Sequence, residues 1–182
     1  MLNDIVQKYL KLFPQDKAKL GILLEQIKRG DDLNDRKNYY GHITGGAIIL
    51  SPDMKKVLMV YHPTHQRWLQ PGGHWDPPEK GPWQSSEREA IEETGVKIAK
   101  RVNVDKDYRV PLNIDSHIIS TTPPLNEPKH LHHDFRYGFV AVSSDLNLED
   151  DVIKEAKWIK INDPKAGLLR VDINRLLSLL KA

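Results

Sequence analysis

The chain has 182 residues, which is enough for one domain with a hydrophobic core and a short appendage. Its formal net charge of +2 gives no argument for a membrane or nucleic-acid partner, although nucleic acid is not excluded. The absence of cysteine excludes disulfides, thiolate zinc sites and cysteine nucleophiles. The longest apolar run near the start spans only residues 47–50, and the first residues lack the pattern of a signal peptide. We therefore expect a cytoplasmic protein.

Residues 2–29 show the periodicity of helices. Apolar residues recur near a 3.6-residue period on both sides of Pro14, which breaks the pattern, and Gly30 is a suitable C-terminal cap. The polar residues 31–37 then form a predicted linker. We expect residues 1–37 to be an N-terminal helical extension that packs on the main domain, shapes a substrate pocket or forms a homodimer interface.

After residue 37 the pattern changes to short apolar runs that are typical of β-strands. The predicted strands are residues 43–50, 57–61, 68–70, 114–120, 135–142 and 156–161. A hairpin around residues 51–53 joins the first two, and helices are predicted at residues 82–94 and 172–181. Strands mixed with a few helices predict an α/β or α+β sandwich over residues 38–182.

The helix predicted at residues 82–94 carries three glutamates. Glu89, Glu92 and Glu93 are three and four residues apart, so they share one face and repel each other. Arg88 can offset part of this repulsion by pairing with Glu92. A solvated acidic face is the ordinary explanation of such a run. Magnesium and manganese, however, prefer carboxylate oxygens, and the tight turn at residues 71–73 places glycine carbonyls where they can approach an ion.

This segment resembles the Nudix box, whose pattern is Gly, five residues, Glu, seven residues and then Arg-Glu-aliphatic-any-Glu-Glu-any-Gly-aliphatic. Gly73 and Glu79 have the required spacing, and residues 88–96 match each specified position if Ala90 is taken as a small member of its class. Eight residues rather than seven separate Glu79 from Arg88. We place the extra residue at Lys80, where it lengthens a loop and leaves the register of the helix intact.

The resemblance implies a Nudix-type α/β/α sandwich with a mixed β-sheet, covering about residues 38–182. It also implies hydrolysis of a nucleoside diphosphate linked to another moiety, with Mg²⁺ or Mn²⁺ as cofactor and a small nucleotide as substrate. The implied roles are metal coordination by the Gly73 carbonyl, Glu89, Glu92 and Glu93, orientation of the glutamates by Arg88, assistance at the loop by Glu79, and proton transfer by Glu92.

Residues 130–137 provide the best clue outside the box. Alternation along a strand would place His132, Asp134 and Arg136 on one face, and His130 would join them if the strand begins early. We expect this face to share a cavity with the helix glutamates. Asp134 is the candidate for an additional metal ligand, with Glu127 as the other candidate.

The same face has a second interpretation. The histidines and Arg136 could bind phosphate or a metal, or they could be side chains of an edge strand that water or backbone satisfies. Asp115 and His117 alternate similarly on an earlier strand and could join the cluster. Tyr39, Tyr40 and His42 are candidates for stacking on a base, although a purely structural role is the more ordinary one.

Two other functions remain open. One is removal of diphosphate from RNA 5′ ends, which basic residues at the pocket mouth would favour and the small net charge does not. The other is a Nudix-fold module that binds or senses nucleotides without turnover. Three mutually repelling glutamates argue against the second, because a pure binder has no need to retain them.

Overall fold

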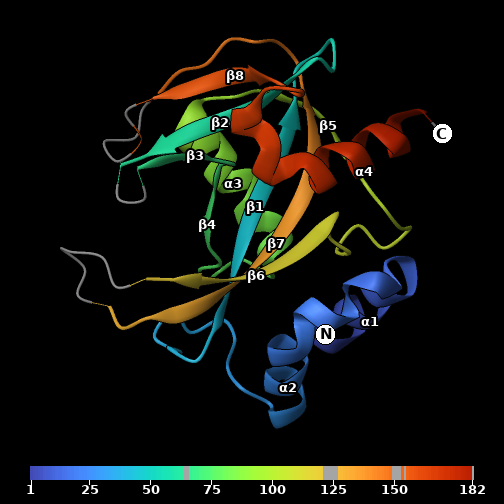
Figure 1. Cartoon of the computed structure of the whole chain (residues 1–182), viewed down its shortest axis with the longest axis vertical. Coiled ribbons are helices and arrows are strands. Elements are labelled where there is room, and N and C mark those ends of the chain that lie inside the picture. The colour runs from blue at the N-terminus through green and yellow to red at the C-terminus, as the bar shows by residue number, and fades with distance from the viewer. Residues whose placement is uncertain (64–65, 121–126, 149–152, 154, 182) are drawn as a thin grey trace.

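The computed structural model describes residues 1–63, 66–120, 127–148, 153 and 155–181, and Figure 1 shows their arrangement. The elements of the described chain are α1 (Leu2–Leu12), η1 (Pro14–Leu20), α2 (Gly21–Arg29), β1 (His42–Leu50), β2 (Lys56–His62), β3 (Arg67–Leu69), β4 (Gly72–His74), α3 (Pro82–Thr94), β5 (Ile98–Val102), β6 (Asn113–Ile119), β7 (His130–Ala141), β8 (Ala156–Lys160), η2 (Pro164–Leu169) and α4 (Arg170–Lys181), where η marks a 3₁₀ helix. In this part of the chain, every helix is too short or too polar to cross a bilayer.

The strands form one mixed sheet with the order β3-β2-β1-β7-β5, to which β4, β6 and β8 add at β1, β7 and β2. The central pair, β1 and β7, is parallel, and the other pairs are antiparallel. Figure 1 shows α3 behind this sheet and α4 in front of it. The predicted α/β/α sandwich with a mixed sheet is therefore confirmed.

Most predicted elements are present with shifts of a few residues, and the helix at residues 82–94 has the predicted bounds. Strand β7 begins at His130 rather than at residue 135, so His130 belongs to the strand. Strands β4 and β5 were not predicted. Two of the three residues of β4 are glycine, which is rare in strands, and β5 carries two consecutive basic residues.

The central strands bury one layer of side chains on each face. Phe135 and Phe139 of β7 belong to the core on the α3 side. On the other side α4 lies so close to β7 that a Cβ at Gly138 would be 2.6 Å from Leu176 Cδ1. A larger residue at position 138 would push α4 away from the sheet.

The N-terminal helices pack on the domain and contribute to the same core, so the expected helical extension is present. Tyr9 uses its hydroxyl to accept a hydrogen bond of 3.2 Å from the backbone N–H of Ile114 in β6. Gln26 donates to the Gly41 carbonyl at 2.9 Å and lies 2.7 Å from His133 Nε2. The extension therefore covers the edge strand β6, which would otherwise expose unpaired backbone groups.

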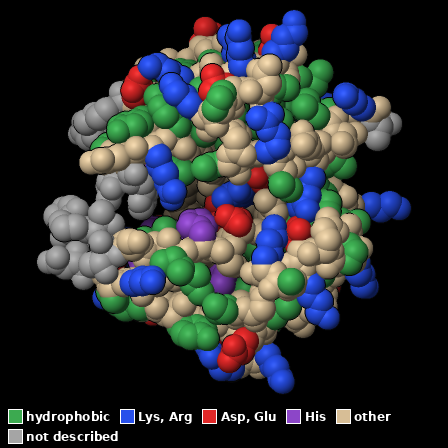
Figure 2. Space-filling model, in the orientation of Figure 1, with side chains coloured by type: hydrophobic (Ala, Val, Ile, Leu, Met, Phe, Trp, Pro, Cys, Tyr) green, Lys and Arg blue, Asp and Glu red, His purple; other side chains and the backbone are tan. Residues whose placement is uncertain are grey.

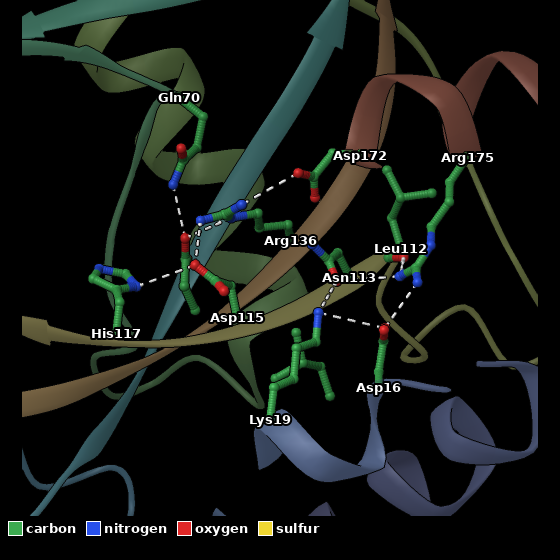
Figure 3. Close-up of polar contacts among 12 residues, drawn as sticks. Asp16, Lys19, Gln70, Leu112, Asn113, Asp115, His117, Arg136, Asp172 and Arg175 are labelled. Atoms are coloured by element: carbon green, nitrogen blue, oxygen red, sulfur yellow. Dashed lines mark hydrogen bonds and ion pairs between the residues drawn. The ribbon is translucent and has the colours of Figure 1, made fainter. Parts of the chain in front are cut away.

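A charged cluster fixes this extension to the last helix. Arg175 of α4 donates to Asp16 at 2.8 Å, to the Tyr9 hydroxyl at 3.0 Å and to Asn113 Oδ1 at 3.1 Å. Figure 3 shows Asp16, Lys19 and Arg175 around Asn113. Because these residues come from both ends of the chain and from β6, they hold the extension and α4 on the same part of the domain.

Candidate functional site

A cavity of about 520 Å³ lies on the α4 side of the sheet and is lined by residues from β1, β4, β6, β7 and α3. Figure 2 shows histidine, acidic and basic side chains gathered in a hollow near the centre of this face. The volume is within the range of roughly 300 to 1,000 Å³ that is usual for small-molecule sites. Two of its walls differ in their side chains: one is formed by α3 and β4, and the other by β1, β6 and β7.

The first wall depends on how closely α3 approaches the sheet. A Cβ at Gly45 of β1 would be 2.5 Å from the Pro82 carbonyl oxygen and 2.5 Å from Ser85 Oγ. Only glycine at this position lets the first turn of α3 rest directly on β1. The helix ends at Gly95, which has a φ of 63° in the left-handed region and whose N–H donates to Ile91 O at 2.8 Å.

Two glutamates of α3 reach the glycines of β4. Glu93 is only 7 % exposed, lines the cavity, and accepts a hydrogen bond of 3.0 Å from the Gly72 N–H. The Glu89 carboxylate lies against Gly73, where an added Cβ would overlap it. Burial raises the pKa of Glu89, and neighbouring Arg88 opposes that rise. The expected meeting of these glutamates with the turn at residues 71–73 is therefore present.

Arg88 lies among the other acidic groups of the box. Its guanidinium is 2.8 Å from Glu79, 2.9 Å from Glu89 and 2.7 Å from Glu92, and it donates to the His74 carbonyl at 3.1 Å. Glu79 thus reaches Arg88 despite the extra loop residue. Glu89 and Glu92 meet at the same nitrogen of Arg88, with the Glu92 side chain 56 % exposed, whereas Glu93 is buried and accepts from Gly72. Their roles as metal ligands, and that of Glu92 in proton transfer, stay predictions.

The second wall is assembled by strand register. Parallel pairing places His42 of β1 opposite His132 of β7, and Thr44 opposite Asp134. On the other side of β7, Asp115 of β6 pairs with Asp134. Paired residues of neighbouring strands point to the same face of a sheet, so these side chains form rows across the cavity floor.

Arg136 holds together three carboxylates of this wall. Its guanidinium is 2.8 Å from Asp134, 3.2 Å from Asp115 and 3.2 Å from Asp172 of α4. Figure 3 shows Arg136 directed at Asp172 and Asp115. Burial alone would lower the pKa of Arg136, but the carboxylates raise it, so the group is charged. Gly46 of β1 leaves space for the Asp134 carboxylate, since a Cβ at this position would be 2.9 Å from Asp134 Oδ1.

The predicted functions of Asp134 and Arg136 are not decided by these contacts. Asp134 also accepts hydrogen bonds from Gln70 at 2.7 Å and from Thr44 at 3.3 Å, so it already has several partners. The guanidinium of Arg136 faces carboxylates rather than open space. Metal coordination by Asp134 and phosphate binding by Arg136 stay predictions, and the geometry favours a role for Arg136 in positioning the acidic groups.

The predicted alternation along β7 is confirmed. His130, His132, Asp134 and Arg136 all line the cavity. His133 points the other way, with its ring nitrogens 2.8 Å from Ser116 Oγ and 2.7 Å from Gln26 Oε1. The expectation that this face shares a cavity with the helix glutamates is met for Glu93, whereas Glu89 and Glu92 are not among the residues that line it.

The residues expected to join this face are also found there. Asp115 and His117 line the cavity, and His117 is the main cause that lowers the pKa of Asp115 to about 2. Glu127, the other acidic candidate, lines the cavity as well and lies 3.8 Å from Arg36.

Four histidines pack against each other at one end of the cavity. The ring centroid of His42 is 4.9 Å from that of His130, 4.7 Å from that of His132 and 5.1 Å from that of His74. Burial lowers the pKa of His132 to about 2 and that of His74 to about 4, so these two imidazoles are neutral near pH 7. Neutral imidazoles can act as hydrogen-bond partners or as metal ligands.

Several of these residues were missed or misplaced by sequence reasoning. His42 was considered only for base stacking, yet it is 2 % exposed and lies in the histidine group. The alternation of His42, Thr44 and Gly46 could have placed it on the cavity face. Tyr39 and Tyr40 border a separate hollow of about 310 Å³, where their base-stacking role stays a prediction.

The comparisons with known proteins agree with this architecture. A family model described as the NUDIX domain matches residues 42–180. A hydrolase of the NUDIX family from Clostridium perfringens is similar in structure, with a TM-score of 0.58, 23 % identity and coverage of 78 % of this chain and 99 % of that one.

Two further solved structures are similar. A NUDIX hydrolase from Nitrosomonas europaea has a TM-score of 0.53, 26 % identity and coverage of 75 % of this chain and 88 % of its own. An Ap4A hydrolase from C. elegans, solved as a binary complex, has a TM-score of 0.50, 15 % identity and coverage of 76 % and 97 %. The sequence matches none of the curated proteins with which it was compared.

Proposed function

The chain belongs to the NUDIX family and is a hydrolase of pyrophosphate bonds, and from this premise we propose that its substrate is a small nucleoside diphosphate linked to another moiety. We further propose Mg²⁺ or Mn²⁺ as its cofactor, since enzymes of this family generally use divalent metals. The observation that carries the proposal is the meeting of Glu89 and Glu93 with the glycines of β4 at the wall of the cavity.

The donor set fits a hard divalent cation. The Glu89 carboxylate lies against Gly73, and Glu93 reaches Gly72, so two carboxylates approach a backbone segment without side chains. Oxygen ligands of this kind are the ones that Mg²⁺ and Mn²⁺ prefer. When bound, such an ion neutralises phosphate oxygens and lowers the pKa of a water molecule.

The protein's own side chains then supply orientation and substrate binding. Arg88 contacts Glu79, Glu89 and Glu92, and so it can fix the positions of these carboxylates. Arg36 and Arg67 line the cavity and can contact the anionic diphosphate. The rest of the cavity lining can contact the nucleoside part. The volume of the cavity suits a small nucleotide better than a polymer.

Removal of diphosphate from RNA 5′ ends is the second candidate. Arg36 and Arg67 favour it, because basic residues at the cavity can contact a phosphate backbone. Among the described residues that line the cavity, however, four are acidic (Glu93, Asp115, Glu127 and Asp134) and three are arginines (Arg36, Arg67 and Arg136), and Arg136 is already held by carboxylates. We therefore place a small nucleotide first.

The test is a panel of substrates with the full chain. The panel contains a nucleoside diphosphate sugar, a dinucleoside polyphosphate, a dinucleotide cofactor and a 5′-triphosphorylated RNA, each with Mg²⁺, with Mn²⁺ and with excess chelator. We expect release of a nucleoside monophosphate from one of the small substrates, and no release with chelator. Turnover of the RNA alone would favour the second candidate, and tight binding without turnover of any compound would favour a sensing module.

A further inference from the structure

Three histidine side chains bring ring nitrogens together in one small volume. His42 comes from the first residue of β1, and His130 and His132 come from the beginning of β7. One ring nitrogen of each lies within 4.8 Å of those of the other two. The group is well buried, since His42 is 2 % and His130 is 5 % exposed.

The hydrogen bonds behind the rings fix which nitrogen faces the group. His130 Nδ1 is 2.7 Å from the Pro128 carbonyl oxygen, and His42 Nδ1 is 3.3 Å from the Asn38 carbonyl oxygen. A carbonyl oxygen can only accept, so both Nδ1 atoms carry the proton. In a neutral imidazole the Nε2 atom then presents a lone pair, and metal-binding histidines commonly have this backbone contact at the other nitrogen.

The nitrogens of His130 and His132 are spaced as two ligands of one ion would be, and the His42 nitrogen lies within 4.8 Å of both. His130 Nε2 and His132 Nε2 are 3.1 Å apart. Two ligands of a tetrahedral Zn²⁺ with Zn–N bonds of about 2.0–2.1 Å are separated by roughly 3.3 Å. His42 Nε2 is 3.2 Å from a fourth imidazole nitrogen, His74 Nε2, so two close imidazole pairs lie side by side and bring His42 within 4.8 Å of the His130 and His132 nitrogens.

We propose that His42, His130 and His132 bind a transition-metal ion, Zn²⁺ in particular, at a site separate from the carboxylates of α3. Imidazole is a ligand that suits Zn²⁺, whereas Mg²⁺ prefers oxygen. Three histidines leave the fourth position of a tetrahedral ion open. His130 and His132 line the main cavity, and a fourth imidazole, His74, lies beside the group with its Nε2 3.2 Å from His42 Nε2. The proposal does not depend on the proposed hydrolysis.

The experiment measures zinc in the untagged full chain. Chelator-treated protein is loaded with Zn²⁺, passed through a desalting column and analysed for metal. We expect one Zn²⁺ per chain to be retained, and Co²⁺ in its place to give the intense visible absorption of a tetrahedral ion. Retention of no zinc, or the weak spectrum of octahedral Co²⁺, would overturn the proposal whatever the variants do.

Matched variants locate the ion. His132→Gln and His130→Gln should each weaken Zn²⁺ binding at least about tenfold, because each removes one of three ligands. His62→Gln, at another histidine that lines the cavity but lies outside the group, should bind like the wild type. Circular dichroism shows which variants fold, and the two ligand variants give independent results. Unchanged binding in a folded ligand variant, or an equal loss in Glu93→Gln, would contradict the assignment.

Discussion

The two walls of the cavity differ in how their charges are balanced. On the α3 wall, Glu89 and Glu93 approach the backbone of β4, and the Arg88 side chain that contacts Glu89 is about one third exposed. On the strand wall, the buried Arg136 contacts three carboxylates, and burial lowers the pKa of the neighbouring His132 so that it is neutral. The carboxylates of the first wall can therefore attract cations, whereas those of the second wall are already held by the buried Arg136.

Because of this difference, substitutions on the two walls should affect different properties: activity on the α3 wall and stability on the strand wall. A carboxylate removed from the α3 wall relieves repulsion in the free protein, so the cost should appear in activity. A charge removed from the strand wall leaves buried partners without compensation, so the cost should appear first in the free energy of unfolding. The following changes test the contrast, beginning with the largest expected effect.

Glu93→Gln should lower kcat by about 10⁴-fold, or roughly 5.4 kcal/mol of barrier, because it removes a cavity carboxylate while keeping the shape of the side chain. Thermal stability should stay equal or rise slightly. Steady-state kinetics at saturating Mg²⁺ and a melting curve measure both quantities. Glu87→Gln on the same helix is the control and should keep its activity. Near-wild-type turnover in Glu93→Gln would contradict the assignment of Glu93 as a metal ligand.

Arg136→Met should lower the free energy of unfolding by about 3–5 kcal/mol, since the buried Asp134 and Asp172 and the partly exposed Asp115 lose their shared cation. Urea unfolding followed by circular dichroism measures this change. Arg109→Met, which removes a more exposed ion pair with Asp107, should cost much less. If Arg136→Met instead keeps its stability and mainly raises KM, then Arg136 binds phosphate, as the sequence suggested.

Asp134→Asn should lower the free energy of unfolding by about 1–3 kcal/mol, because it weakens the charged hydrogen bonds from Arg136 and Gln70. The Mg²⁺ concentration that gives half-maximal activity distinguishes two roles. If Asp134 only positions Arg136, that concentration stays the same in the variant. A marked rise, together with lower turnover, would make Asp134 a metal ligand.

Deletion of Lys80 should have the smallest effect. Glu79 reaches Arg88 across the longer loop, and the Lys80 N–H donates to Gln84 Oε1 at 2.5 Å. If the residue only lengthens the loop, metal-dependent activity should stay within about tenfold, or roughly 1.4 kcal/mol of barrier. A much larger loss in kcat/KM would show that the longer loop positions Glu79.

The contrast between the walls also explains what the sequence could predict. The α3 wall comes from one continuous segment, and its helix, its caps and its glutamates follow from local spacing. The strand wall required the pairing of β1, β6 and β7. Alternation predicted which side of β7 carries His132 and Asp134, but the opposing His42 and Thr44 depend on strand register.

Two parts of the site were beyond local sequence reasoning. Asp172 reaches Arg136 from α4, and the distance of 36 residues between them gives no pattern to recognise. Likewise Arg175 and Asp16 are 159 residues apart, and their pairing at 2.8 Å depends on the completed fold. The sequence therefore predicted the helices of the N-terminal extension but not their place on the domain.

The most direct test of the central claim is equilibrium binding of Mn²⁺, measured from the electron paramagnetic resonance signal of the free ion. The account predicts that the wild type binds Mn²⁺, that Glu93→Gln binds it at least about tenfold more weakly, and that His132→Gln binds it like the wild type. Equal Mn²⁺ affinity in Glu93→Gln and the wild type would contradict the claim that the carboxylates of α3 hold the metal.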